Sequence, residues 1–291
     1  MSSLLVCAQP ATGLPDAFFA REGPALLLKR LATVPRLSRV TPASHLEVRP
    51  APDQVSSGIV EIDALTGGFP RGCLTEIYGP ACSGRTGMLL ATLAAATGRQ
   101  EACALVDVSD AFDPYSAAAS GTVFENLLWI RCQSQPSKSK HKQGRAPEKS
   151  YWTLQETSQP EFARLEQALK VTDLLLQSGG FGLIAIDLAD ISVQAARRIP
   201  LTSWFRFRRA VENTPTVLLV VGQSPCARTC ASLLLQLQAK GHGIHHVESV
   251  PTHTRLLNGL SIHAEVARSR MERKPAQSVS TEFGSKALWT G

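Results

Sequence analysis

The sequence lacks the features of a secreted, disulfide-linked or membrane protein. Seven of its 291 residues are cysteines, an odd number scattered singly from Cys7 to Cys230, which is typical of thiols in a reducing cell rather than of a disulfide framework. No apolar run reaches the roughly 18 residues that a membrane span needs, and no basic region followed by an apolar core stands at the N-terminus. We therefore expect a cytoplasmic protein without a membrane segment.

A zinc site is also poorly supported. Cys226 and Cys230 have three residues between them, and the only cluster that could complete a metal site is His242, His245 and His246. A zinc finger needs a second Cys or His pair at a regular spacing, and that pair is missing. We favour packed thiols beside a polar loop.

The chain is long and apolar enough for one main domain. Its hydrophobic fraction is 44%, which suffices for one sizeable core with arms and tails. The net charge of +6 is compatible with a nucleic acid or an acidic protein as partner and proves neither. We expect an N-terminal arm over residues 1–52, with a short basic amphipathic helix at 24–37 and a Pro-rich linker, then a core over 53–272 and a flexible tail over 273–291.

A glycine-bounded loop is the strongest functional signal. Residues 73–78 predict a buried strand and residues 86–97 an apolar helix, and the loop between them fits the pattern G-x-x-x-x-G-K-[ST] except that Arg85 replaces the lysine. Backbone N–H groups of such a loop, with the helix N-terminus behind it, cradle phosphates. The candidate nucleotide-binding residues are Gly79, Pro80, Ala81, Cys82, Ser83, Gly84, Arg85 and Thr86.

Alternating strands and helices after the loop predict an α/β fold with a mainly parallel central sheet flanked by helices. The strand predicted over 182–187 ends in Asp187, as a Walker B strand does, so Asp187 and Thr86 are candidate magnesium ligands. Further strands are expected at 102–107, 127–132, 216–221 and 259–267, and helices from Asp113 to near Gly121 and at 162–177, 192–199, 201–212 and 229–238.

Two basic segments each allow two interpretations. Residues 134–160 form a long basic insertion of low hydrophobicity, which indicates a solvated loop; contact with nucleic acid is the second interpretation. In 201–212, Trp204, Phe207 and Val211 share one face, which slightly favours a core helix with solvated arginines over an arginine and aromatic surface for DNA or a protein. The candidate contact residues are Lys138, Lys140, Lys142, Arg145, Lys149, Arg206 and Arg209.

The residues around the loop closely resemble bacterial RecA recombinases. The specific part of the likeness lies in residues 57–65, 67–72 and 75–80, and the whole likeness covers roughly residues 55–270. It implies a RecA-type P-loop NTPase core with ATP and Mg²⁺ as ligands. It also adds Asp113 and Gln223 to the nucleotide-binding candidates.

Departures from the RecA pattern point away from ATP turnover. The guanidinium of Arg85 is longer than a lysine ammonium and planar, so it cannot act as a compact point charge between two phosphates; nucleotide binding is expected to be weak or absent, and hydrolysis lost or weak. The position of the family's catalytic glutamate holds Ser109, and serine is no general base without an activating neighbour. Asp110 could take that role, although a shift of one residue turns its side chain to the opposite face.

The resemblance also bears on DNA binding and assembly. The two DNA-binding loops of RecA correspond here to short segments, around residues 198–201 and 224–230, so filament formation by the RecA mechanism is not expected. Arg268 and Arg270 align with a Lys-x-Lys pair that in RecA reaches the neighbouring subunit's nucleotide. An interface role in a homo-oligomer and a plain basic strand end are equally supported.

In keeping the RecA scaffold while losing the catalytic residues, this sequence resembles the ImuA-like group of RecA-related proteins. That resemblance implies an accessory factor in DNA repair and SOS-type translesion mutagenesis, with RecA and an error-prone DNA polymerase as partners. One alternative is an active DNA-dependent ATPase or recombinase of the RecA class, in which Arg85 contacts phosphate and Asp110 orients water. The other is a nucleotide-independent DNA-binding protein that uses residues 138–149 and 197–209.

Overall fold

The computed structural model describes residues 51–132, 159–240, 259–270 and 280–286, together with a few positions between 26 and 34. The chain divides into two units, residues 1–50 and 51–291. In the first unit, Leu26 and residues 29–31 are helical, within the helix predicted over 24–37. The basic insertion predicted over 134–160 lies outside the described residues, except for its last two positions.

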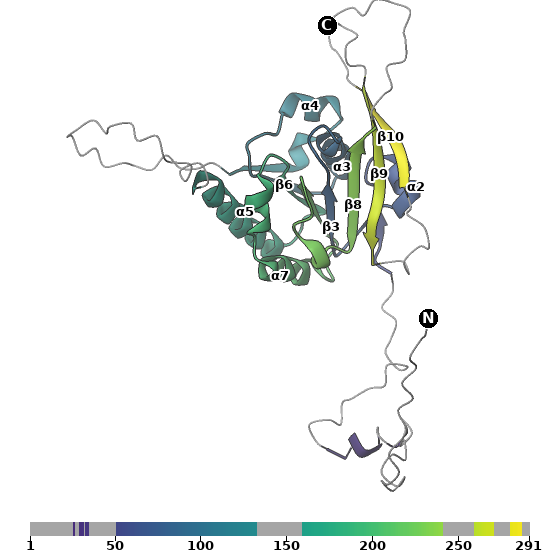
Figure 1. Cartoon of the computed structure of the whole chain (residues 1–291), viewed down its shortest axis with the longest axis vertical. Helices are drawn as coiled ribbons and strands as arrows, with labels where there is room; N and C mark the ends of the chain where they lie inside the picture. The colour runs from purple at the N-terminus through teal and green to yellow at the C-terminus, as the bar shows by residue number, and fades with distance from the viewer. Residues whose placement is uncertain are drawn as a thin grey trace, which may run out of the picture. The chain divides into compact units, whose positions relative to one another are not determined.

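The second unit is built on an eight-stranded sheet with the order β10-β9-β8-β3-β7-β6-β4-β5 (Figure 1). The six strands from β8 to β5 run parallel to one another, β9 runs antiparallel to β8, and β10 antiparallel to β9. The bounds are β3 Cys73–Tyr78, β4 Cys103–Asp107, β5 Leu127–Arg131, β6 Leu183–Leu188, β7 Val217–Gly222, β8 Leu233–Ala239, β9 Gly259–Ser269 and β10 Ser280–Lys286. This confirms the predicted α/β fold with a mainly parallel central sheet.

Helices cover both faces of the sheet, so its central strands are buried. Every residue of β4, β6 and β7 is buried, as expected for strands whose sequences are nearly continuous apolar runs. The helices are α2 Val60–Thr66, α3 Arg85–Gly98, α4 Pro114–Ala119, α5 Gln159–Ser178, α6 Val193–Arg197 and α7 Leu201–Val211. Short 3₁₀ turns lie at η2 Phe124–Asn126 and η3 Arg228–Cys230, and a two-residue ladder joins β1 Gln54–Val55 to β2 Phe69–Pro70. Among the described helices, none is long and apolar enough to cross a membrane.

The core consists of two apolar clusters, one on each face. Leu89 and Leu93 of α3 pack against strand residues such as Ile77 on the first face. On the second, α5 and α7 cover the sheet, and Trp204 and Phe207 have no exposed surface. Val211 is equally buried, so the interpretation of residues 201–212 as a core helix is confirmed.

The helix predicted over residues 229–238 is wrong, because β8 occupies most of that range. β8 pairs with β3 on one side and β9 on the other. Leu233, Leu235 and Leu237 alternate at the period of a strand and fill the cluster on the α3 face. Burial between two strands therefore overrides the good helix propensity of leucine, glutamine and alanine.

The flexible tail predicted over 273–291 is wrong for residues 280–286, which form the edge strand β10. Ser280, Glu282 and Gly284 are exposed, whereas Phe283 is buried in the cluster on the α3 face. An edge strand exposes many of its side chains and so has a polar average composition. The prediction of a flexible tail was based on this polar composition.

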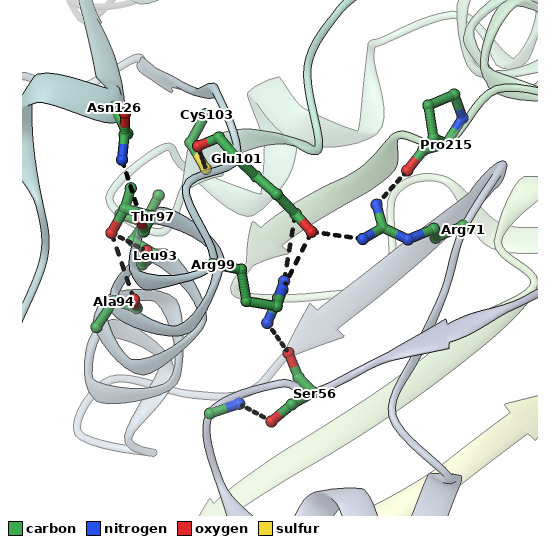
Figure 2. A network of polar contacts seen from close by, with 11 residues as sticks. Ser56, Arg71, Leu93, Ala94, Thr97, Arg99, Glu101, Cys103, Asn126 and Pro215 are labelled. Carbon is green, nitrogen blue, oxygen red and sulfur yellow. Dashed lines mark hydrogen bonds and ion pairs between the residues drawn. The ribbon is translucent and has the colours of Figure 1, made fainter.

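A polar network holds the amino edge of the sheet, where the parallel strands begin (Figure 2). Arg71, before β3, donates to Glu101 Oε1 at 2.5 Å and to the Pro215 carbonyl at 2.5 Å. Arg99, after α3, donates to Glu101 Oε1 at 3.1 Å and to the Ser56 carbonyl at 3.3 Å. Burial alone would raise the pKa of Glu101, but the hydrogen bonds from Arg99 and Arg71 outweigh it and lower the pKa below its ordinary value.

The same edge ties the end of α3 to the start of β5. The Asn126 side chain donates to the Thr97 carbonyl at 3.0 Å, and the Val123 N–H donates to Thr97 Oγ1 at 3.0 Å. Both hydrogen bonds are partly buried, and they hold the end of α3 against the segment that leads into β5.

Candidate functional site

The carboxyl edge of the parallel strands brings the main candidate residues together. The loop over 79–84 follows β3, Ser109 follows β4, Asp187 lies near the end of β6, and Gln223 follows β7. These four strands are consecutive neighbours in the sheet, in the order β3-β7-β6-β4. Open parallel sheets bind ligands in the crevice at this edge.

The loop shape depends on two glycines. Gly84 has a φ of 86° and precedes α3 as its N-cap, and an added Cβ there would collide with the Ile262 side chain of β9. An added Cβ at Gly79 would collide with the Leu237 carbonyl of β8. The loop therefore packs directly against β8 and β9, and only glycine fits at positions 79 and 84.

The remaining loop residues differ in exposure. Pro80, Ala81 and Cys82 are exposed, and so is Thr86 in the first turn of α3. Ser83 is only 1% exposed, and its Oγ has no hydrogen-bond partner among the described residues. An unpartnered buried hydroxyl costs free energy, so Ser83 is a polar group still available to a ligand at the base of the loop.

Arg85 is drawn into the protein rather than left in the solvent. It is 7% exposed, and its Nη1 donates to the Ala189 carbonyl at 3.2 Å. Gln223 Nε2 donates to the same carbonyl at 3.0 Å and to the Ile191 carbonyl at 3.2 Å. Burial lowers the pKa of Arg85, against the effect of the nearby Asp187 and Asp190 carboxylates. Arg85, at the start of α3, and Gln223, after β7, thus both bind the segment that follows β6.

Asp187 lies beside Arg85 in a buried acidic environment. Burial, together with the neighbouring Asp107 and Asp190 carboxylates, raises the pKa of Asp187 to about 6, while the Ala189 N–H and Arg85 oppose the rise. The Ala189 N–H donates to Asp187 Oδ1 at 2.8 Å. Sequence reasoning missed Asp107, which is the register partner of Asp187 and also ends an apolar strand.

Asp110, the residue proposed for the water-orienting role, is held in an ion pair, and Ser109 stands at the position of the family's catalytic glutamate. Ser109 Oγ is buried without a hydrogen-bond partner among the described residues. Asp110 has a φ of 58°, and its carboxylate accepts both Arg131 Nε at 2.5 Å and Arg131 Nη2 at 2.7 Å. These hydrogen bonds lower the pKa of Asp110. The bidentate pair directs the carboxylate toward β5, at the far edge of the sheet from the loop.

Asp113 serves as a helix cap. Its carboxylate accepts the Tyr115 and Ser116 backbone N–H groups at 3.2 and 3.0 Å and the Ser116 hydroxyl at 2.6 Å. These hydrogen bonds satisfy the first turn of α4, as side-chain caps do. The structure therefore gives Asp113 a local role in α4.

The donor set for a cation is small. Among the described residues, no group of three or more His, Cys, Asp or Glu side chains could hold a metal ion. The predicted pair of Thr86 and Asp187 is the set on which a magnesium site would depend. The six described cysteines are free, and Cys226 and Cys230 are buried, in agreement with packed thiols; the histidine cluster at 242–246 lies outside the described residues.

The segment after Gln223 is fastened to the core. Glu76 of β3 accepts the Cys226 and Ala227 backbone N–H groups at 2.5 and 3.0 Å. Arg268 donates to the Arg228 carbonyl at 2.9 Å, and Arg270 donates to the Thr229 carbonyl. Sequence reasoning missed Glu76, although a glutamate inside an apolar strand is a visible signal. It is 1% exposed, burial raises its pKa, and its Oε2 has no partner among the described residues.

The segment after β6 is also held by hydrogen bonds. Glu161 of α5 accepts the Ser192 backbone N–H at 2.6 Å and the Ser192 hydroxyl at 3.0 Å. Ile191 and Ile199 are buried. Ser192 lies before residues 198–201, which the sequence resemblance aligns with one DNA loop of RecA, whereas the hydrogen bonds of Glu76, Arg268 and Arg270 fall within residues 224–230, aligned with the other.

The basic candidates separate into two groups. Arg206 forms a bidentate pair with Asp173 of α5 at 2.9 and 2.5 Å, and Arg209 is 86% exposed with Glu212 at 3.7 Å. Lys138, Lys140, Lys142, Arg145 and Lys149 all lie outside the described residues.

The fold and this edge define a RecA-type P-loop core, and comparison with known proteins agrees. Residues 44–142 match the family described as the RecA N-terminal domain. The RecA proteins of Brucella canis, Brucella suis and Brucella abortus are each 34% identical to this chain over 137 residues, which is 46% of this chain and 30% of theirs. These matches support a place in the RecA superfamily. The chain matches less than a third of the length of these relatives.

Proposed function

We propose that this protein is a RecA-related accessory factor in DNA repair, of the ImuA type, that acts in SOS-type translesion mutagenesis through protein partners rather than by ATP turnover. The observation that carries the proposal is the position of Arg85. Its guanidinium is buried and donates to Ala189. Because only 7% of Arg85 is exposed, its guanidinium has little surface left with which to stabilise charge that develops on a transferring phosphoryl group.

Nucleotide binding, where it occurs, would use the loop backbone. The N–H groups of residues 79–86 and the start of α3 fit a phosphate, with Thr86 and Asp187 as magnesium ligands. Magnesium would neutralise phosphate charge there. Asp187 must lose its proton to bind the cation, and its pKa of about 6 leaves it mostly ionised at neutral pH. We expect weak affinity for ATP, because Arg85 already occupies the cationic position beside Asp187.

Hydrolysis is disfavoured by the residues after β4. An active ATPase or recombinase of the RecA class would need a carboxylate to orient water. Ser109 cannot supply one, and Asp110 would first have to leave its bidentate pair with Arg131. The alternative as an active enzyme therefore has less support than the accessory role.

Assembly and DNA binding follow from the resemblance. RecA and an error-prone DNA polymerase are the proposed protein partners, and Arg268 and Arg270 are proposed to contribute to an interface, in a homo-oligomer or with RecA. Direct contact with DNA through residues 138–149 remains part of the proposal as a secondary activity. The hydrogen bonds that hold residues 226–229, within the segment aligned with a DNA loop of RecA, support a protein that does not form RecA-type filaments on single-stranded DNA.

A nucleotide titration with and without single-stranded DNA, combined with a hydrolysis assay, tests the proposal. The wild-type protein should show no DNA-stimulated turnover. Arg85→Lys should raise the affinity for ATP by about tenfold, which corresponds to about 1.4 kcal/mol, because lysine restores a compact charge at the phosphates. Arg99→Lys, at the other end of α3, is the matched control and should leave nucleotide binding unchanged. DNA-stimulated turnover by the wild type that Arg85→Lys does not alter would refute the proposal.

A further inference from the structure

Three arginines gather where β9 ends, at the amino edge of the parallel strands. Arg208 comes from α7, and Arg268 and Arg270 come from the end of β9; we call them the arginine cluster. Burial, then the charges of Arg208 and Arg268, lower the pKa of Arg270. α7 and the C-terminal end of β9 lie at the same edge of the sheet in Figure 1. The three side chains therefore form one group of like charges.

The arginine cluster has no acidic partner within the described part of the chain. The ion pairs found there involve other arginines and lysines, such as Arg206 with Asp173 and Arg209 with Glu212. Like charges held together without counter-charges repel one another, and an anion that binds among them removes this cost. The cluster is thus suited to a negatively charged ligand.

Two members of the arginine cluster are already oriented. Arg268 and Arg270 each donate to a carbonyl of η3. A guanidinium carries five N–H donors, so each retains donors for a ligand after making this hydrogen bond. Guanidinium groups fixed in this way can bind a carboxylate in bidentate geometry without first losing side-chain freedom.

An apolar stripe on α7 leads into the arginine cluster. Leu201, Phe205 and Arg208 are spaced at i, i+4 and i+7, so they share one side of the helix. Leu201 is 40% exposed and Phe205 50% exposed, whereas Trp204 and Phe207, on the sheet side of α7, are fully buried. Large exposed apolar side chains beside a charged cluster are typical of a protein-binding surface.

We propose that the apolar stripe and the arginine cluster together dock an acidic amphipathic segment of a protein partner. Carboxylates of that segment would pair with the arginines, and its apolar side chains would cover Leu201 and Phe205. The apolar stripe favours a peptide over a nucleic acid, because nucleic-acid interfaces are more polar and are dominated by phosphate contacts. The inference rests on the proposed function, in which the protein acts through partners, and it specifies the chemistry of such a partner.

Fluorescence anisotropy with the full-length chain tests this docking. The probe is a synthetic labelled helical peptide of about four turns, with leucine and phenylalanine on one face and glutamate and aspartate on the others. Arg208→Glu and Phe205→Ala should each weaken binding by about tenfold or more, as expected for an anchor at the centre of an interface. Phe205 is half exposed, and Arg208 forms no side-chain hydrogen bond or ion pair with another described residue, so both variants should fold; circular dichroism checks this.

Two matched controls separate this surface from charge or hydrophobicity in general. Lys170→Glu makes the same change of net charge on α5, and Leu174→Ala removes an exposed leucine from the same helix. Both should leave the affinity for the peptide unchanged. A peptide that binds all variants equally, or that does not bind at all, would overturn the proposal.

A competition experiment decides against nucleic acid. An oligo(dT) strand should not displace the peptide at equal concentration, and a peptide with lysine in place of the acidic residues should not bind. If oligo(dT) displaces the peptide and Phe205→Ala has no effect, the surface binds nucleic acid and the proposal is wrong. All these titrations are made without nucleotide, so ATP turnover by the wild type would refute the proposed function and leave the docking result intact.

Discussion

The two edges of the central sheet contain polar groups of opposite character. At the amino edge, Glu101 is paired with two arginines, and Thr97 and Asn126 have hydrogen-bond partners. At the carboxyl edge, Asp187 lies near two other carboxylates, and Ser83 and Ser109 have buried hydroxyls without partners among the described residues. The network around Glu101 at the amino edge therefore stabilises the fold, whereas the carboxyl edge retains unfavourable interactions that a ligand could relieve.

Positive φ values do not separate the two edges. Cys82 and Asp110 adopt φ values of 60° and 58° at the carboxyl edge, and Gln100, Asn213 and Arg228 adopt values of 62°, 66° and 48° near the amino edge. Non-glycine residues in this region cost free energy. Backbone strain is therefore present at both edges, and the two edges differ in their polar side chains.

The largest effect is expected from Glu101→Ala at the amino edge. Loss of the carboxylate leaves Arg71 and Arg99 without their partner, and we expect the free energy of unfolding to fall by about 2 to 3 kcal/mol. The pKa of Glu101 is lowered in the folded protein, so its contribution is present above the ordinary pKa of a glutamate and is lost as the pH falls. Urea unfolding at neutral and acidic pH measures both effects, and an equal loss at pH 7 and pH 3 would contradict them.

Asp187→Asn should change the free energy of unfolding in the opposite direction and stabilise the protein. Because the pKa of Asp187 is raised to about 6, its contribution to stability is present below the ordinary aspartate pKa and is lost as the pH rises through 6. We expect the asparagine variant to be more stable than the wild type by about 1 to 3 kcal/mol at pH 8, and the difference to shrink toward pH 4. If the variant is less stable than the wild type at pH 8, favourable contacts of the Asp187 carboxylate outweigh the cost of burying its charge, and the prediction is wrong.

Gln223→Ala should have a smaller effect. It removes hydrogen bonds to the Ala189 and Ile191 carbonyls, and we expect a loss of about 1 kcal/mol. Hydrogen exchange of the backbone N–H groups over residues 188–192 should become faster. Gln238→Ala, at an exposed position in β8, is the control and should change neither measurement.

The smallest effect is expected from Arg99→Ala. Its side chain is 32% exposed, and solvent screens ion pairs at such positions, so we expect a loss of about 0.5 kcal/mol. High salt should reduce the difference from the wild type. A loss as large as that of Glu101→Ala would mean that Arg99, rather than Arg71, is the main partner of Glu101.

Elements with strong local signals were predictable from the sequence. β3 is predicted to the residue, because it stands between a turn-rich segment and the glycine-bounded loop, which mark its two ends. β8 and β10 were not predictable, since β8 has helix-forming residues and β10 a polar average, and both owe their conformation to neighbouring strands. At the site, the sequence indicated the loop, Asp187 and Gln223. The contacts of Arg85 with Ala189, and of Asp110 with Arg131, join residues 104 and 21 positions apart, and no local pattern encodes them.

The place of β10 has a practical consequence for any shortened version of the protein. A fragment that stops at Arg270 would lose β10, which pairs with residues Gly259 to Glu265 of β9. β9 would then present an unpaired row of backbone groups, which is a template for aggregation, and Phe283 would no longer cover Ile262. Because Ile262 packs against Gly84, the loss of β10 should disturb the loop over residues 79–84, almost 200 positions earlier in the chain.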